Sequence, residues 1–270
     1  MRRLILICFA SLLAFSCRKT ATPVPSDVVV RVSVETSSAK AAVGDESSGA
    51  FPILWQQGDQ ISLNGVLSAP MSSTMAGDSE AAFAFSGVSS SSTYNLLYPG
   101  AASNTVSLDG KTIPMYASGS SLDEVFVFHH LACGVRLQLV GDFSVSSLSV
   151  SAPGGEKIAG VFSVSGGNLT PSDALSSLTV EYPAPVGLSR LNPTYFYLFF
   201  APGTFSDGLL LSATEPTEGI TRSWKISTGG TLVKGKMYSI PETAFASAEL
   251  SDGIIISLEQ MTEEPITIEL

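Results

Sequence analysis

Two adjacent histidines, His129 and His130, and a cysteine three residues further on, Cys133, are the side chains best suited to chemistry. Imidazole and thiolate groups bind zinc, but the chain has no third histidine and no cysteines at zinc-binding spacing. Adjacent residues of a strand point to opposite faces, so the two histidines are poorly placed to bind one ion. His129 shares its predicted face with Cys133 and with aliphatic residues, which indicates a hydrophobic core. We therefore predict no metal site here.

A second candidate is the tetrapeptide GDSE at 77–80, which is faintly similar to a serine-hydrolase motif. Such a serine needs a surrounding strand–turn–helix and a histidine as its base. No helical pattern surrounds the tetrapeptide, and both histidines are explained as core residues. The sequence also contains no phosphate-binding glycine loop, calcium-binding loop or dinucleotide fingerprint. We expect no catalytic residue, no metal and no cofactor.

Composition and charge exclude further classes of function. The 270 residues are 44% hydrophobic and only 14% charged, which is typical of a folded chain and not of a disordered one. The net charge is −10, and no cluster of lysines and arginines occurs. Nucleic acids and anionic lipid surfaces attract basic proteins. Binding to either through charge is therefore not expected.

The first 16 residues are predicted to be a lipoprotein signal peptide. The basic start MRR is followed by the short apolar stretch LILICFASLLAFS, which ends immediately before Cys17. A cysteine at this place is the one that receives lipid, so Cys17 is the predicted lipidation site and the anchor to the membrane. The alternative is an ordinary signal peptide that happens to contain a cysteine. With Cys8 removed and Cys17 acylated, Cys133 has no partner for a disulfide.

The elements expected beyond the signal peptide are β-strands. Apolar residues recur at every second position, as in 28–34, where Val28, Val30, Val32 and Val34 share one face. In 127–139 the odd-numbered residues form the apolar face. The stretch 194–203 is apolar on both faces, which predicts a central strand covered on both sides. Short strands separated by glycine- and proline-containing turns are typical of antiparallel β-sandwiches.

These patterns divide the chain into parts of different character. Each of the two strand-rich parts has about the length of one β-sandwich. The predicted parts are the signal peptide 1–16, a polar tether 17–27, an N-terminal β-sandwich domain 28–142, a C-terminal β-sandwich domain 143–246 and a C-terminal tail 247–270.

Five short motifs resemble, in the same order, those of the fimbrillin-like family of Bacteroidetes, the type V pilins and their relatives. The first contains Trp55, Gly58, Asp59 and Ile61, and the likeness extends over residues 28–242. The motifs are FPILWQQGDQISL, LLYPG, FVFHHLAC, YFYLFFAPG and LVKGKMYSI. This resemblance implies an all-β fold of two transthyretin-like antiparallel β-sandwich domains and export as a lipoprotein. It also implies assembly by strand addition: a protease removes an N-terminal strand, and the C-terminal strand of another subunit takes its place.

The C-terminal tail fits the role of donor strand. Its alternation places apolar residues on one face in two short segments, and a strand with such a face is an aggregation hazard unless it is paired. The predicted donor face consists of Ile254, Ile256, Leu258, Ile266, Ile268 and Leu270. Two interpretations remain open: donation to a neighbouring subunit, or a hairpin folded onto the chain's own C-terminal sheet.

The candidate processing sites depart from the family pattern. Lys40 stands where relatives carry arginine, and Arg31 lies within the first predicted strand, where pairing can protect it. An uncleaved member suits an anchor or accessory subunit better than a stalk subunit.

We therefore expect a non-enzymatic, lipid-anchored pilus subunit or pilus accessory protein at the outer membrane and cell surface. Its expected partners are other pilus subunits bound by strand exchange, the membrane through Cys17, and a host or bacterial surface ligand. The alternative is a surface lipoprotein that binds glycan or protein and never polymerises. For glycan, the candidate platform aromatics are Trp55, Tyr94, Tyr116 and Trp224, although aromatic residues of a β-sandwich more commonly form core.

Overall fold

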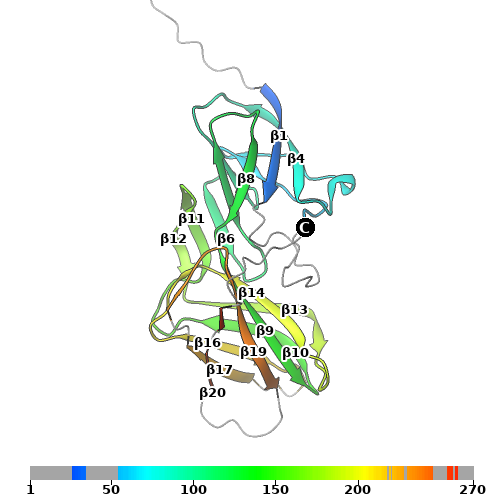
Figure 1. The fold of residues 1–270 in the computed structure, drawn as a ribbon, viewed down its shortest axis with the longest axis vertical. Coiled ribbons are helices and arrows are strands. Elements are labelled where there is room, and N and C mark those ends of the chain that lie inside the picture. The colour runs from blue at the N-terminus through cyan, green and yellow to red at the C-terminus, as the bar shows by residue number, and fades with distance from the viewer. Residues whose placement is uncertain are drawn as a thin grey trace, which may run out of the picture.

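The regular structure of the chain is almost entirely β-strand (Figure 1), which confirms the predicted all-β class. The computed structural model describes residues 26–34, 54–217, 219, 221–227, 230–245, 254–257 and 259–260. Within these ranges one short 3-10 turn, η1 (Ser73–Met75), interrupts the strands. No helix in the described ranges is long and apolar enough to cross a membrane.

The first half of the chain forms a seven-stranded sheet in the upper part of Figure 1. Its order is β3-β2-β5-β7-β8-β1-β4, so the first strand lies inside the sheet between two later ones. The strands are β1 (Ser26–Val34), β2 (Ser62–Leu63), β3 (Val66–Leu67), β4 (Glu80–Val88), β5 (Tyr94–Tyr98), β7 (Met115–Gly119) and β8 (Val125–His130).

Trp55 organises the core of this half. Its side chain is fully buried, and its ring meets Phe83, Tyr98 and Phe128 edge to face at centroid distances of 5.1, 5.4 and 6.0 Å. The indole Nε1 donates a hydrogen bond of 3.3 Å to the carbonyl oxygen of Ser79. Large aromatic side chains stabilise a core mainly through the apolar area they bury.

The turn that follows Trp55 contains Gly58 and Asp59, which belong to the same sequence motif. Gly58 has a φ of 91°, which favours glycine, and Asp59 accepts hydrogen bonds from the Gln56 amide at 2.7 Å and the Tyr98 hydroxyl at 3.0 Å. Burial, followed by the Asp59 carboxylate, raises the pKa of Tyr98. Trp55 is thus a central residue of the first core, and the turn at Gly58 and Asp59 is linked to that core through Tyr98.

The second half has two larger sheets that share one core. Their orders are β13-β10-β16-β17-β20 and β14-β9-β19-β21, and a small pair, β15-β18, lies beside them. The strands are β9 (Cys133–Gly141), β10 (Ser144–Ser151), β13 (Ser177–Gly187), β14 (Thr194–Phe200), β15 (Gly203–Thr204), β16 (Leu209–Thr214), β17 (Thr221–Ser227), β18 (Thr231–Leu232), β19 (Met237–Phe245), β20 (Ile254–Ser257) and β21 (Glu259–Gln260).

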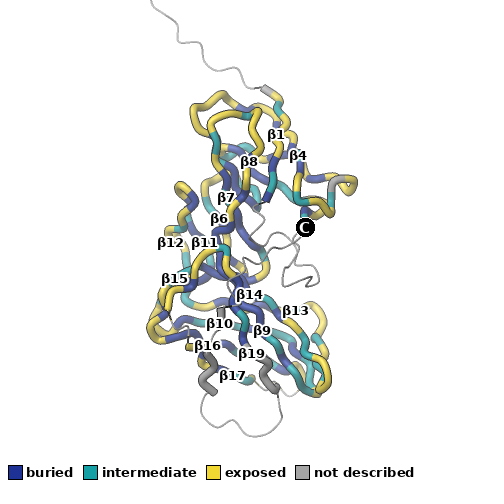
Figure 2. The backbone as a smooth tube through the Cα atoms, in the orientation of Figure 1, coloured by how far each residue is buried: buried dark blue, intermediate teal, exposed yellow. Residues whose placement is uncertain are grey.

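A third sheet joins the two halves. Strand β6 (Thr105–Leu108), from the first half, pairs with β11 (Ala159–Ser165), which in turn pairs with β12 (Asn168–Leu175). A separate cluster of buried side chains, which contains Val106, Phe162 and Phe199, draws on both halves. In Figure 2 the buried backbone runs through both halves and through this junction.

The chain passes from the first hydrophobic core to the second before residue 142, where the sequence predicts the domain boundary. The last residue of the first core is Phe128, and the second core begins at Cys133. Strand β9 therefore packs and pairs with the second half, although it lies within the predicted domain 28–142. The first strand also begins at Ser26, two residues inside the predicted tether.

Two strand predictions need correction. Strand β14 was predicted to be central but lies at a sheet edge; it is apolar on both faces because Phe200 enters the second core while Phe199 enters the junction cluster. The sheets are also not antiparallel throughout. Among the described strands, the pairs β1–β8, β9–β19 and β17–β20 are parallel.

Candidate functional site

Strand β1 occupies a slot between two strands that are distant in the sequence. It pairs in parallel with β8, where Arg31 lies opposite Val125, and antiparallel with β4, where Arg31 lies opposite Ala82. Neighbouring sheet strands lie about 4.8 Å apart, so β4 and β8 cannot pair directly while β1 is present. Withdrawal of β1 would leave two unpaired strand edges facing each other.

The alternation in the sequence of β1 matches this position. Val30, Val32 and Val34 are 0%, 1% and 4% exposed and belong to the first core, as predicted from their spacing. Full burial of an aliphatic side chain of this kind contributes about 1.5–3 kcal/mol. Any strand that replaced β1 would need apolar residues at the same alternate positions.

Of the two candidate processing residues, the structure describes Arg31. The Arg31 side chain is exposed, and its guanidinium donates a hydrogen bond of 3.3 Å to the carbonyl oxygen of Asp123. Its backbone, however, lies in a strand that is paired on both sides, so a protease would first need β1 to open. Lys40 lies outside the described residues, as does Cys17.

Part of the C-terminal tail adds to the sheets of its own chain. Strand β20 pairs in parallel with β17, which places Ile254 opposite Trp224 and Ile256 opposite Ile226. Trp224 and Ile226 are buried in the second core. Strand β21 pairs antiparallel with β19 in the other sheet. The remaining predicted donor residues, Leu258, Ile266, Ile268 and Leu270, lie outside the described residues.

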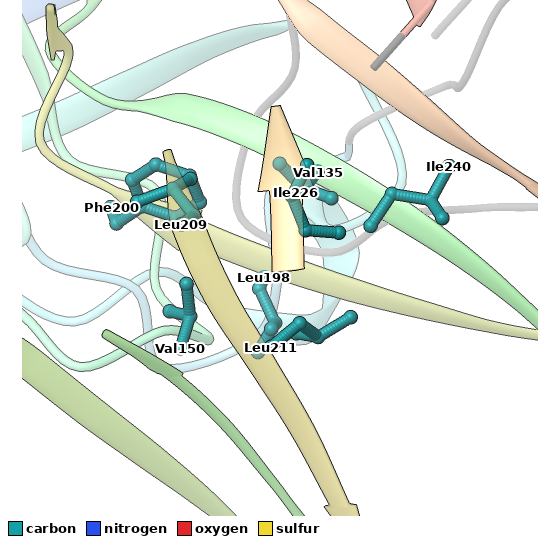
Figure 3. A pocket seen from close by; sticks show the side chains of 8 residues that line it. All are labelled: Val135, Val150, Leu198, Phe200, Leu209, Leu211, Ile226 and Ile240. Atoms are coloured by element: carbon teal, nitrogen blue, oxygen red, sulfur yellow. The ribbon is translucent and has the colours of Figure 1, made fainter. Parts of the chain in front are cut away.

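A small apolar cavity lies between the two larger sheets of the second half. It measures about 10 Å³ and is lined only by aliphatic and aromatic side chains, which Figure 3 shows converging from both sheets. Two of its lining residues, Ile226 and Ile240, belong to β17 and β19, the strands that pair with β20 and β21. A cavity of this size barely admits one water molecule, and an apolar one stays dry. The lining residues are Val135, Val150, Leu198, Phe200, Leu209, Leu211, Ile226 and Ile240.

The histidine and cysteine predictions are only partly correct. His129 is exposed, contrary to the prediction, whereas His130 and Cys133 are buried. The buried positions change from even-numbered to odd-numbered residues at this point. They change because Leu131 and Ala132 are both buried where the chain passes from the first core to the second. No group of three potential metal ligands occurs among the residues that the structure describes.

Cys133 is expected to be unreactive in the folded protein. Its thiol donates to the carbonyl oxygen of Phe200 at 3.5 Å, and burial raises the pKa of the thiol. In the chain from Arg18 onward Cys133 is the single cysteine. We expect a thiol-reactive dye to label it at least about 100-fold more slowly in buffer than in concentrated urea. Equal rates would contradict the buried position.

The proposed aromatic sugar platform does not form. Trp55, Tyr94 and Trp224 are buried in the two cores. Tyr116 packs against the junction cluster and donates a hydrogen bond of 2.7 Å to the side chain of Asn95. Three of the four candidates are therefore core residues, and Tyr116 is partly buried at the junction.

A cleft beside the β11–β12 hairpin was not predicted from the sequence. Its volume is about 370 Å³, and it combines an apolar floor with three charged side chains. Its residues are spread along the chain from Leu131 to Lys234, so no local motif marks it. The lining residues are Leu131, Glu156, Lys157, Phe162, Gly167, Asn168, Leu169, Pro171, Ala201, Pro202, Gly203, Phe205 and Lys234.

Comparison with solved structures decides the fold. The crystal structure of a "putative cell adhesion protein" from Bacteroides uniformis matches with a TM-score of 0.50 and 17% identity, over 87% of this chain and 99% of that one. The chain has the fold of that protein. The resemblance to fimbrillin-like proteins is thereby confirmed at the level of the fold; a transthyretin-like topology and a count of two domains remain predictions.

Two further solved structures match over similar lengths. A "putative cell adhesion protein" from Bacteroides ovatus matches with a TM-score of 0.47 and 13% identity, over 87% of this chain and 96% of that one. The tip fimbrial protein Mfa3 from Porphyromonas gingivalis, with a C-terminal truncation, matches with a TM-score of 0.38 and 10% identity, over 87% and 98%. No protein-family model matches the chain. No curated protein matches it either.

Proposed function

We propose that the protein is a non-enzymatic subunit, anchor or accessory protein of a cell-surface fimbrium that joins its neighbours by β-strand addition and contributes to adhesion. The observation that carries this proposal is the position of β1. It is an N-terminal strand inserted between β4 and β8, with Val30, Val32 and Val34 buried on its inner face. Removal of such a strand creates a slot, and an incoming strand with the same alternation fills it.

The tail supplies a strand of suitable chemistry. A donor needs backbone groups for the exposed edges and apolar side chains at every second position, and Ile254 and Ile256 have that spacing. In the structure β20 and β21 pair with edges of the chain's own sheets, one in parallel and one antiparallel. Donation to a neighbour would therefore require the tail to leave these edges first.

The remaining parts of the proposal rest on the sequence and on the similar proteins. The name of the Bacteroides uniformis protein describes cell adhesion, and Mfa3 is described as a tip fimbrial protein, which supports a place at the cell surface. Lipid on Cys17 would hold the protein at the outer membrane. Its partners would be other pilus subunits and a ligand on a host or bacterial surface.

Strand addition is tested by nicking the chain. The chain from Arg18 onward is cut within 18–40 by trypsin and followed on native and denaturing gels, beside a twin that lacks 254–270. A ladder of assemblies that forms only after the cut, and only with the tail present, is the expected result. Monomer in every lane would overturn self-assembly by strand addition.

The second candidate function is a surface lipoprotein that binds a ligand and does not polymerise. Two observations favour it: the tail strands pair in cis, and the cleft beside β11 and β12 has the size of a ligand site. In the nicking experiment this function predicts monomer throughout.

A further inference from the structure

The cleft beside the β11–β12 hairpin has the composition of a small-molecule site. Such sites measure about 300–1,000 Å³ and combine a mainly apolar lining with a few polar groups that fix orientation. The floor of this cleft includes Leu131, Phe162 and Phe205, each no more than 3% exposed. The lining also includes two conformationally rigid residues, Pro171 and Pro202. The floor is thus fixed by packing before any ligand arrives.

Two lysines give the cleft donors for an anionic group. Lys234 donates one hydrogen bond of 2.7 Å from Nζ to the carbonyl oxygen of Gly167, which ties the ammonium group to the turn of the hairpin. An ammonium group has three donors, so two remain for a ligand. Lys157 lines the same cleft from the loop before β11. The pair offers a local positive charge on a chain whose net charge is −10.

Glu156 gives the cleft a hydrogen-bond acceptor. Its Oε2 is buried and makes no hydrogen bond among the described residues. The carboxylate lies close to Gly154, where an added Cβ would be 2.6 Å from both of its oxygens. A buried acceptor without a donor is costly, and a ligand hydroxyl would satisfy it.

These groups together select the chemistry of the ligand. It must carry an anionic group for the lysines, at least one hydroxyl or similar donor for Glu156, and an apolar face for the floor. Asn168, which also lines the cleft, can both donate and accept. A sugar that carries a carboxylate has all three features on one ring. A neutral sugar lacks the anionic group, and a simple fatty acid lacks the donor.

We propose that this cleft binds a carboxylate-bearing sugar residue, a uronic acid or a sialic acid, at the end of a glycan. None of its lining residues belongs to β1, β4, β8 or β17, so the site is separate from the slot and from the tail. Binding is expected of the monomer, and its failure would leave strand addition undecided. It deepens the adhesive part of the proposed function by naming a ligand class.

The test uses the chain from Arg18 onward, which retains every described residue. Glucuronic acid and N-acetylneuraminic acid are titrated separately and followed by amide chemical shifts and by calorimetry, with glucose and N-acetylglucosamine as neutral counterparts. One or both acids should shift the amides of Gly167 and Asn168, and the neutral sugars should not. The acid that binds identifies the source of the carboxylate.

Matched variants assign the binding to the cleft. Each lost charge-assisted hydrogen bond weakens binding by about 10-fold or more, so Lys157→Met with Lys234→Met should weaken it by about 100-fold. Glu156→Gln, which keeps the size of the side chain, should weaken it by about 10-fold. Lys236→Met is the control, because Lys236 is exposed, lies two residues from Lys234 and does not line the cleft.

Several outcomes would overturn the proposal. No shift at the cleft amides with either acid would do so, as would equal binding of glucose and glucuronic acid. Binding that both Lys236→Met and the double variant weaken equally would indicate a general charge effect. Binding of short peptide carboxylates in place of the acidic sugars would assign the cleft to a different class of ligand.

Discussion

Replacement of Trp55 by alanine is expected to lower the free energy of unfolding of the first core by about 3–5 kcal/mol. The ring is fully buried and meets three other aromatic rings edge to face, so its loss leaves a large cavity that those rings cannot fill. The change also leaves the carbonyl oxygen of Ser79 without the indole donor.

The second tryptophan makes the measurement specific. The chain has two tryptophans, and Trp224 belongs to the second core, so in Trp55→Ala the remaining fluorescence reports on that core alone. In urea, the transition seen by circular dichroism should begin at lower concentration in the variant. The Trp224 transition should move much less if the two cores unfold separately.

The control is Leu191→Ala, because Leu191 is 90% exposed and its loss should change stability by less than about 0.5 kcal/mol. A loss below about 1 kcal/mol in Trp55→Ala would contradict the central place of Trp55. A joint shift of both transitions would show that the junction sheet of β6, β11 and β12 couples the two halves into one unfolding unit.

The fold class could be predicted because alternation is a local property. Val30, Val32 and Val34 alternate in the sequence and are buried as a set, and the motif from Trp55 to Asp59 marks a turn that the first core requires. Neither inference needs knowledge of distant residues.

The errors arose where one stretch of chain serves two cores. Residues 130–133 are all buried, because the chain there passes from the first core to the second, and this shifted the predicted face of His129. For the same reason Phe199 and Phe200 of an edge strand are both buried. Alternation of apolar and polar residues indicates a strand with one buried face. At a junction between two cores both faces are buried, so alternation no longer identifies the buried face.

The candidate sites divide in the same way. The alternating residues of β1 and of the tail were found from sequence, because strand addition depends on a local pattern. The parallel pairing of β1 with β8 and of β20 with β17 is set by the order of strands, which alternation does not encode. The cleft needed Glu156, Phe162 and Lys234 to meet from separate loops and strands, and such a meeting is a property of the fold.

Whether β1 can leave its slot can be measured without a protease, by introducing one charge on the buried face of the strand. Val32→Asp puts a carboxylate at a position that is 1% exposed, and an unpaired buried charge costs several kcal/mol. If β1 is a separable insert, the cheapest response is for β1 to leave the slot while the rest of the first core holds. Hydrogen exchange of the β1 amides should then accelerate by about 100-fold or more, since each 1.4 kcal/mol is a factor of ten.

Val29→Asp is the matched control, because the same substitution on the same strand falls at a residue that is 64% exposed. Its β1 amides should exchange within about threefold of those of the unchanged chain. Peptides that cover β5 and β14 serve as internal references for the two cores, because neither strand pairs with β1. If β5 loses protection together with β1 in Val32→Asp, the strand is an integral part of the first core. A subunit built on that plan could not exchange β1 for a neighbour's strand, and the slot would have no role in assembly.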